Sequence, residues 1–219
     1  MGDSIKLYGY WRSSASWRVR IGLELKKLAY EYVPVPLVRS GGEQRQEQHR
    51  SRNPMQQVPV LEVLDGEQTL RLTQSLAILE YLEERWPEPP LLPGDRAARA
   101  QSRALAELVN SGIQPLQNLT VLQQLKRAGA DEKAWARHFI DRGLRALETV
   151  AAGTAGRFLV GDELSLADVC LVPQLYNARR MGVELGPFVT LRRVEDNCST
   201  LEAFERAHAD RQPDAEPGS

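Results

Sequence analysis

Cysteine and histidine are scarce in this sequence, with two Cys and three His among 219 residues. Cys170 and Cys198 are too few for the disulfide framework of a small secreted protein, and Cys170 lies in an apolar run, which predicts a buried thiol. His49, His138 and His208 are scattered along the chain and have no partners at metal-ligand spacing. The sequence therefore predicts neither a disulfide scaffold nor a metal site.

An excess of charge of one sign and long apolar runs are also missing. Lys and Arg number 28 against 29 Asp and Glu, a formal net charge of -1, which gives no electrostatic basis for binding nucleic acid or a membrane surface. No segment approaches the roughly 20 apolar residues of a spanning helix, and the first residues lack a basic region followed by an apolar one. We expect a soluble, cytoplasmic protein that meets anionic ligands through a few local arginines.

The first eighty residues contain a pattern of short strands and helices. The predicted elements are a strand at 5–10, a helix at 17–27, an edge strand at 30–37, a loop or short surface helix at 40–53, a hairpin at 58–72 and a helix from Ser75. Residues 17–27 also alternate like a strand, but their length favours a helix. This order of elements predicts a small α/β domain with a mixed sheet.

Four prolines between Trp86 and Gly94 end this pattern, and long helical stretches follow. We expect helices at 96–110, beyond Pro115, at 132–152 and at 165–180, with Ser165 and Asp168 forming a capping box. The predicted domains are therefore 4–86, a Pro-rich linker at 87–94, an all-helical domain at 95–211 and a loose tail at 212–219.

The junction between the first strand and helix, residues 12–18, gathers three serines, two arginines and Trp17. Hydroxyl groups, backbone N–H groups and the positive end of a helix dipole can together hold an anion or an ionised sulfur. Serine is also a preferred N-cap, and from these residues alone a plain helix cap is the simpler interpretation.

The element order of the first domain is that of a thioredoxin fold, whose redox chemistry needs C-x-x-C at this junction. Here the four positions are Ser13, Ser14, Ala15 and Ser16. Disulfide exchange by the protein itself is excluded, although a hydroxyl at this place can still donate to the sulfur of another molecule.

Several ungapped blocks resemble the zeta class of glutathione transferases. They lie at 13–21, 53–59, 74–82 and 112–119, and the resemblance runs from Ile5 to the Arg-Gln-Pro-Asp sequence at 211–214. It implies an α+β glutathione transferase fold, with an N-terminal thioredoxin-like mixed-sheet domain and a C-terminal all-helical bundle. The resemblance, and not the periodicity, favours a catalytic role over simple capping at Ser13.

The resemblance also implies the site. Ser13 is the catalytic hydroxyl that favours the glutathione thiolate, Ser14 assists it, and Arg12, Arg18 and Arg180 meet substrate carboxylates. The positions implied to bind glutathione are Ser13, Ser14, Ala15, Ser16, Trp17, Arg18, Gln44, Val58, Gln74, Ser75, Gln114, Asn118, Leu119 and Thr120.

Three of these assignments have particular implications. A cis bond is implied at Val58-Pro59, and Gln74-Ser75 would receive the γ-glutamyl end of glutathione. Ala15 departs from the cysteine that many members have, which removes a reactive thiol and spares both serines.

The activity implied by the resemblance is the glutathione-dependent cis–trans isomerisation of maleylacetoacetate, an unsaturated diacid, to fumarylacetoacetate in tyrosine and phenylalanine breakdown. The alternatives are isomerisation of maleylpyruvate, glutathione transfer to α-haloacids with loss of halide, and a non-catalytic protein that binds glutathione. The resemblance further implies a homodimer.

Overall fold

The computed structural model describes residues 4–66 and 68–216, which form two compact units. Residues 4–89 together with 202–216 make up the sheet unit, and residues 90–201 make up the helical unit. The predicted all-helical domain at 95–211 differs from this division at its C-terminal end. The physical reason is that α9 (Glu202–Arg206) packs against α1 (Ser14–Leu25), which belongs to the sheet unit.

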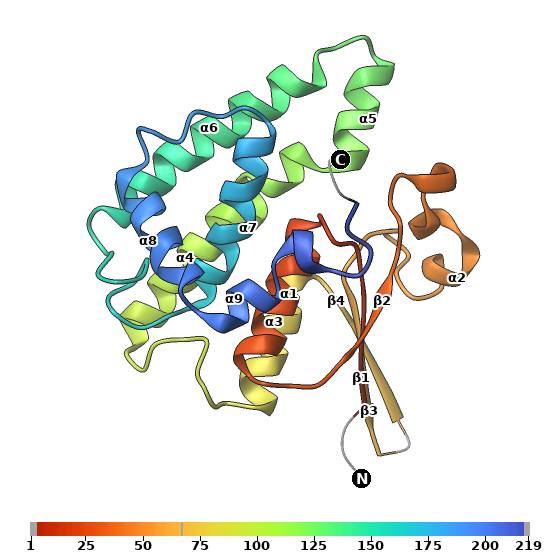
Figure 1. The fold of residues 1–219 in the computed structure, drawn as a ribbon, viewed down its shortest axis with the longest axis horizontal. Coiled ribbons are helices and arrows are strands. Elements are labelled where there is room, and N and C mark those ends of the chain that lie inside the picture. The colour runs from red at the N-terminus through yellow and green to blue at the C-terminus, as the bar shows by residue number, and fades with distance from the viewer. Residues whose placement is uncertain (1–3, 67, 217–219) are drawn as a thin grey trace. The chain divides into compact units, whose positions relative to one another are not determined.

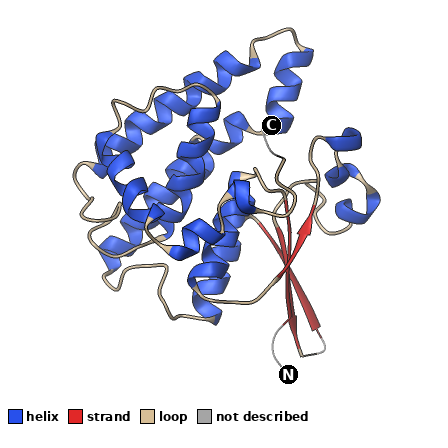
Figure 2. Cartoon of the chain, viewed as in Figure 1, coloured by secondary structure: helices blue, strands red, loops and turns tan. Residues whose placement is uncertain are grey.

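A four-stranded mixed sheet forms the centre of the sheet unit, as the sequence predicts (Figure 2). Its strands are β1 (Ser4–Gly9), β2 (Glu31–Pro34), β3 (Val60–Asp65) and β4 (Gln68–Thr73), in the order β2-β1-β3-β4. β1 pairs with β2 in parallel, whereas β3 pairs antiparallel with both β1 and β4. Pro34 is tolerated in β2 because β2 is an edge strand.

α1 and α3 (Ser75–Arg85) pack together on one face of this sheet (Figure 1). Apolar side chains alternate along the strands toward that face, and Leu7 and Leu61 are fully buried there. Gly22 allows the two helices to approach closely, because a Cβ atom at this position would lie 2.3 Å from the Leu79 side chain. The resulting core fixes where both helices begin.

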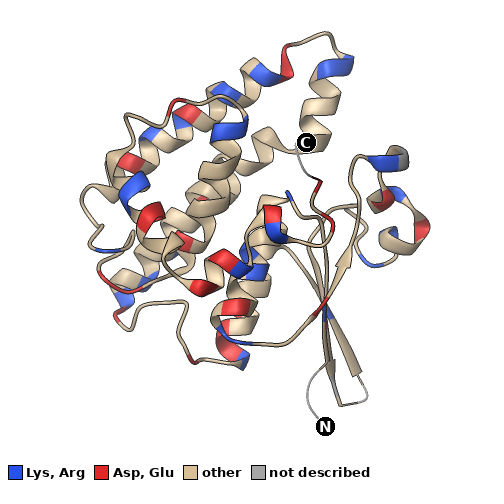
Figure 3. Ribbon diagram, viewed as in Figure 1, with Lys and Arg blue, Asp and Glu red and all other residues tan. Residues whose placement is uncertain are grey.

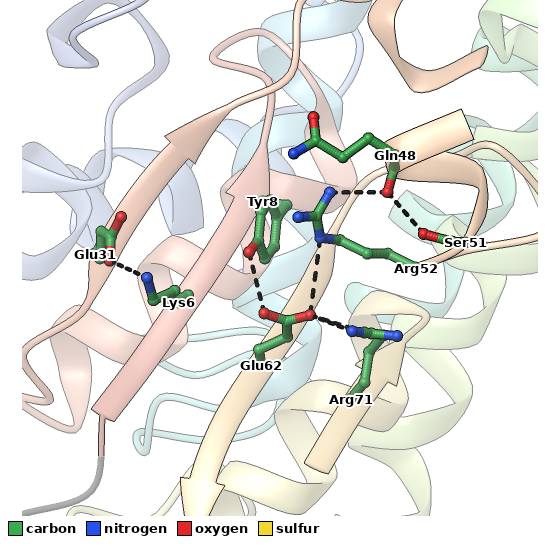
Figure 4. A network of polar contacts seen from close by, with 8 residues as sticks. All are labelled: Lys6, Tyr8, Glu31, Gln48, Ser51, Arg52, Glu62 and Arg71. Carbon is green, nitrogen blue, oxygen red and sulfur yellow. Dashed lines mark hydrogen bonds and ion pairs between the residues drawn. The ribbon is translucent and has the colours of Figure 1, made fainter. Parts of the chain in front are cut away.

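The opposite face of the sheet carries a polar network around Glu62 of β3 (Figure 4). Its carboxylate accepts a hydrogen bond from the Tyr8 hydroxyl at 3.0 Å and pairs with Arg71 at 2.7 Å and Arg52 at 3.8 Å. The Arg52 guanidinium lies 4.4 Å from the centre of the Tyr8 ring, and it also donates to the Gln48 carbonyl. The network therefore attaches the segment around α2 (Glu47–Arg50) to the sheet.

This segment consists of η1 (Arg39–Gly41), η2 (Glu43–Arg45) and α2, which confirms the loop or short surface helix predicted at 40–53. It leads directly into residues 53–59, one of the blocks that carry the resemblance. Arg52, a member of the network around Glu62, directly precedes those residues.

The helical unit contains α4 (Arg96–Gly112), η3 (Gln114–Gln117), α5 (Leu119–Arg127), α6 (Glu132–Ala151), α7 (Leu166–Arg180) and α8 (Val189–Ser199). The capping box at Ser165 and Asp168 is confirmed, and Pro173 lies inside α7. α8 has no counterpart among the helices predicted from the sequence. Both signs of charge are interspersed along α6 (Figure 3).

Both cysteines are buried free thiols, which confirms the expectation for Cys170. Within the described residues, no helix is long and apolar enough to span a membrane. After η4 (Ala209–Arg211), Asp214 accepts hydrogen bonds from Trp11 and Tyr32 of the same unit, in contrast to the predicted loose tail at 212–219. Residues 217–219 of that prediction lie outside the described residues.

Candidate functional site

Ser13 is the N-cap of α1, as its position in the sequence predicts. Its Oγ accepts a hydrogen bond from the Ser16 N–H at 3.2 Å, and its own N–H donates to the Tyr10 carbonyl at 3.0 Å. The serine therefore stands at the end of a tight turn that follows β1. Ser13, Ser14 and Ala15 are all partly exposed at the positive end of the α1 dipole.

Capping leaves the Ser13 hydroxyl able to donate. A hydroxyl has one O–H donor and two acceptor lone pairs, and the bond from Ser16 N–H occupies one lone pair. A capping role and donation to a bound anion are therefore compatible in the same side chain.

The three residues that follow have a different environment. Ser16 and Arg18 are fully buried, and Trp17 is 2% exposed. The Arg18 Nη1 donates to the Ser75 Oγ at 3.2 Å. The prediction that Arg18 meets a substrate carboxylate thus disagrees with its burial, because its guanidinium has no exposed surface and is directed to Ser75.

Arg12, in contrast, is partly exposed. Its guanidinium lies 5.0 Å from the centre of the Trp11 ring, and Trp11 is itself 2% exposed. The cation–π contact gives the flexible arginine a rigid aromatic support beside Ser13.

A second helix start lies at Gln74 and Ser75. Gln74 is exposed and has φ 69°, a left-handed backbone conformation that is uncommon for a residue other than glycine. Ser75 is the first residue of α3 and is 3% exposed. Its oxygen accepts from Arg18, which leaves the Ser75 hydroxyl proton able to donate, at the helix end where the first N–H groups of α3 have no partner within the helix.

The Val58-Pro59 peptide bond is cis, as the resemblance implied. The preceding carbonyl, that of Gln57, lies within hydrogen-bond distance of two side chains, the His49 Nε2 and the Asn53 Nδ2, both at 2.9 Å. These two contacts hold the backbone around Val58. Sequence reasoning did not assign a role to His49, for which no motif gave a signal.

Gln44 lies in η2 and is 6% exposed. Its Nε2 donates to the Leu37 carbonyl at 3.3 Å, and its buried Oε1 has no partner among the described residues. The sheet unit thus contains the predicted positions 12–18, 44, 58 and 74–75.

The remaining predicted residues belong to the helical unit. Gln114 begins η3, Asn118 caps α5 by accepting from the Thr120 N–H at 3.1 Å, and Leu119 is partly buried. Thr120 is exposed.

Arg180, at the end of α7, is exposed and donates through its Nε to the Asn177 Oδ1 at 3.1 Å. Asn177 in turn donates to the buried Gln117 of η3, whose Nε2 donates to Gln174 at 2.6 Å. These buried amides form a polar chain that ends at Arg180, and sequence reasoning missed all three of them. Asn177 and Gln174 lie three and six residues before Arg180, a spacing that suits one side of a helix but is too common to be diagnostic.

Metal ligation has no candidate in the part of the chain that the structure describes, since no group of three or more His, Cys, Asp or Glu side chains converges there.

The chain is similar to known proteins over its whole length. The family models described as "Glutathione S-transferase, N-terminal domain" and "Glutathione S-transferase, C-terminal domain" match residues 3–84 and 122–209. The maleylacetoacetate isomerase of Mus musculus is 50% identical over 208 residues, 95% of this chain and 94% of that protein.

Solved structures agree with this relationship. A maleylacetoacetate isomerase from Anaeromyxobacter dehalogenans 2CP-1, with glutathione bound in its active site, superposes with a TM-score of 0.91 at 57% identity, covering 98% of this chain and 99% of that one. The same protein has been crystallised with dicarboxyethyl glutathione and citrate in its active site.

A bacterial maleylpyruvate isomerase described as a zeta-class glutathione S-transferase has a TM-score of 0.89 at 43% identity, covering 96% of this chain and all of that one. With both family models matched and relatives this similar along the full chain, the protein belongs to the glutathione S-transferase family, in its zeta class.

Proposed function

We propose that this protein catalyses the glutathione-dependent cis–trans isomerisation of maleylacetoacetate to fumarylacetoacetate. The observation that carries the proposal is the Ser13 hydroxyl, which caps α1 through its oxygen and retains a donor proton at the positive end of the helix. The 50% identity to a maleylacetoacetate isomerase supports the choice of substrate.

The residues of the sheet unit fit the functional groups of glutathione. A thiolate suits the Ser13 hydroxyl and the α1 N-terminus, and a carboxylate suits the Ser75 hydroxyl and the α3 N-terminus. The backbone of Val58, beside the cis bond, suits an extended peptide, and Gln44 offers an amide. Gln74, Gln114 and the start of α5 are further proposed contacts.

Bound glutathione supplies a sulfur nucleophile whose reversible addition to the cis double bond leaves a single bond, about which the substrate rotates. Ser13 donates to this sulfur and favours its ionised form, and Ser14 assists. Each unit by which the thiol pKa is lowered corresponds to about 1.36 kcal/mol. Arg12 and Arg180 hold the carboxylate and oxyanion charge of the diacid.

Arg18 receives a different role in this proposal from the one the resemblance implied. Because it is fully buried and donates to Ser75, it supports the carboxylate-binding hydroxyl and does not contact the substrate.

A second candidate substrate is maleylpyruvate, which the 43% identity to a maleylpyruvate isomerase favours. Glutathione transfer to α-haloacids is a proposed side activity. Rates on maleylacetoacetate, maleylpyruvate and dichloroacetate, each with and without glutathione, test these assignments. We expect the highest kcat/KM on maleylacetoacetate and no turnover without glutathione. Undiminished isomerisation in its absence would refute the mechanism, and binding of glutathione without any turnover would indicate a non-catalytic member.

We also infer a homodimer that acts in the cytoplasm, in tyrosine and phenylalanine catabolism. The resemblance to the zeta class supports the dimer, and light scattering of the purified protein tests it. A monomeric mass at micromolar concentration would contradict this inference.

A further inference from the structure

The C-terminal segment of the sheet unit returns to the loop between β1 and α1. There the Asp214 Oδ2 accepts a hydrogen bond from the Trp11 backbone N–H at 3.0 Å and another from the Tyr32 hydroxyl at 3.3 Å. Trp11 is separated from Asp214 by 203 positions in the sequence. The contact therefore joins the two ends of the sheet unit's sequence, and no local pattern predicts it.

A buried arginine, Arg20, donates to the backbone carbonyl of Trp11. Arg20 of α1 is fully buried, and it donates to the Trp11 carbonyl at 2.8 Å and to the Ala207 carbonyl at 3.1 Å. The Trp11 N–H and C=O are thus both engaged, one by the carboxylate of Asp214 and one by the guanidinium of Arg20. We call Trp11, Arg20, Tyr32 and Asp214 the C-terminal clasp.

The charges of the clasp complement each other. Burial lowers the pKa of Arg20, whereas the nearby Tyr32 and Asp214 act to raise it. Burial also raises the pKa of Tyr32, which remains a neutral phenol and donates to Asp214. A buried guanidinium needs a compensating anion, and Asp214 supplies one at this place.

The clasp bears directly on the proposed site. The Trp11 ring supports the Arg12 guanidinium at 5.0 Å, and the turn from Tyr10 to Ser13 is closed by the Ser13 N–H donating to the Tyr10 carbonyl. Any shift of Trp11 therefore moves the aromatic surface on which Arg12 rests.

We propose that Asp214 is a positioning residue, which fixes Trp11 and thereby directs Arg12 toward a carboxylate of the diacid substrate. This inference rests on the proposed function for the identity of that substrate. Its physical basis is that the partly buried Trp11 N–H loses its acceptor when Asp214 is replaced, which disfavours the present conformation of the loop.

The test compares Asp214→Ala and Asp214→Asn with Glu205→Gln, a matched control. Glu205 lies in the same C-terminal segment and pairs on the surface with Arg211, so its substitution removes the same charge without touching the clasp. The readouts are kcat and KM for maleylacetoacetate, the glutathione Kd, and hydrogen exchange of the segment containing residues 10–13.

Asp214→Ala should raise KM for the diacid at least fivefold, with a smaller change in kcat, and should speed exchange in residues 10–13. Asp214→Asn should lie between this variant and the wild type, because an amide oxygen can still accept from the Trp11 N–H. Glu205→Gln should match the wild type. If Asp214→Ala fails to fold, the same measurements are made on Asp214→Asn and Tyr32→Phe. Each of these substitutions weakens the hydrogen bonds of the clasp but keeps a side chain of similar size in place.

A lowered melting temperature with KM and exchange unchanged would overturn the proposal, since it would leave Asp214 a purely structural role. A wild-type enzyme that binds glutathione but does not turn over maleylacetoacetate would instead refute the proposed function. In that event the exchange rates and the Kd of a non-reactive dicarboxylate such as malonate still decide whether Asp214 positions Arg12.

Discussion

Ser13 combines a structural and a proposed chemical role in one hydroxyl group. Its oxygen accepts the Ser16 N–H at 3.2 Å, and the proposal requires its proton for the glutathione sulfur. The two roles can be separated experimentally, because a carboxylate can cap a helix but cannot donate a hydrogen bond.

Ser13→Ala should lower the isomerisation rate roughly 10- to 100-fold, the range expected for losing a hydrogen bond to a charged group, and should reduce stability by about 1 kcal/mol. Ser13→Asp should retain the cap and the stability, yet lose activity. Asp95→Ala removes the N-cap of α4 and serves as the control, with a similar loss of stability and an unchanged rate. Wild-type activity in Ser13→Ala would transfer the role to Ser14.

Arg18 shows how burial redefines a residue that the motif alone would assign to the substrate. Because the Arg18 Nη1 donates to the Ser75 Oγ at 3.2 Å, we expect Arg18 to affect glutathione binding by orienting the Ser75 hydroxyl.

A double-mutant cycle with Arg18→Met and Ser75→Ala tests this coupling. Each single variant should weaken glutathione binding, and the double variant should weaken it by less than the sum, with a coupling of about 1 kcal/mol measured by calorimetry. Additive effects would show that Arg18 acts independently of Ser75.

At the scale of elements, η3 and α7 cooperate in holding Arg180. The chain of buried amides from Gln174 through Gln117 to Asn177 ends on the Arg180 Nε. The arginine is exposed, and its hydrogen bond to Asn177 restricts the directions in which its side chain can point.

Asn177→Ala should therefore raise KM for the diacid about fivefold or more, while changing the glutathione Kd less than twofold. Arg179→Ala provides the matched control, because Arg179 neighbours Arg180 on α7 but pairs with Glu195 at 2.6 Å. Steady-state kinetics on both variants decide the matter. An equal rise of KM in the two variants would argue against a specific role for the amide chain.

α8 illustrates what local sequence cannot provide. Its residues Leu191, Val194 and Cys198 are buried at helical spacing, but Phe188 at its N-cap offers no capping side chain. The missing cap comes from Glu148 of α6, whose carboxylate accepts from the Thr190 and Leu191 N–H groups at 2.8 and 3.0 Å. A helix start that depends on a residue some forty positions away gives no signal in its own segment.

At the scale of the whole molecule, the buried Asp168 makes stability depend on pH. Burial raises its pKa to about 6, although the Leu159 and Ser165 backbone N–H groups donate to it. The folded state therefore binds this proton more tightly than the unfolded state. The stability contributed by this group is greatest below about pH 4, falls as the pH rises toward 6 and is constant above that.

The expected loss is about 2 kcal/mol between pH 4 and 7 relative to Asp168→Asn, which cannot ionise. Denaturant unfolding of both proteins across this range measures it. Asp95→Asn is the control, because it removes the carboxylate of an exposed helix cap, where burial does not affect the titration. Parallel pH profiles for the wild type and Asp168→Asn would disprove the assignment.

Much of the fold could be predicted from the sequence because it depends on interactions between residues close together in the chain. Examples are the alternation of apolar and polar residues in β1, the Asp65-Gly66 turn, and the Ser13 and Ser165 helix caps. The cis bond at Val58 was accessible only through the resemblance. The contacts of Asn177 with Gln117 and of Asp214 with Trp11 join segments 60 and 203 positions apart, so periodicity could not reveal them. The contact of His49 with the Gln57 carbonyl is local, but no motif marks it.

The C-terminal clasp has a consequence for the order in which the chain is synthesised. The ribosome delivers residues 4–89 first, but Arg20 lacks its Ala207 acceptor and Trp11 lacks Asp214 until residues 207 and 214 have emerged. Residues 90–201 are contiguous and contain all of the helical unit. The helical unit can thus be completed before the sheet unit, in which the charged Arg20 still lacks one of its carbonyl acceptors.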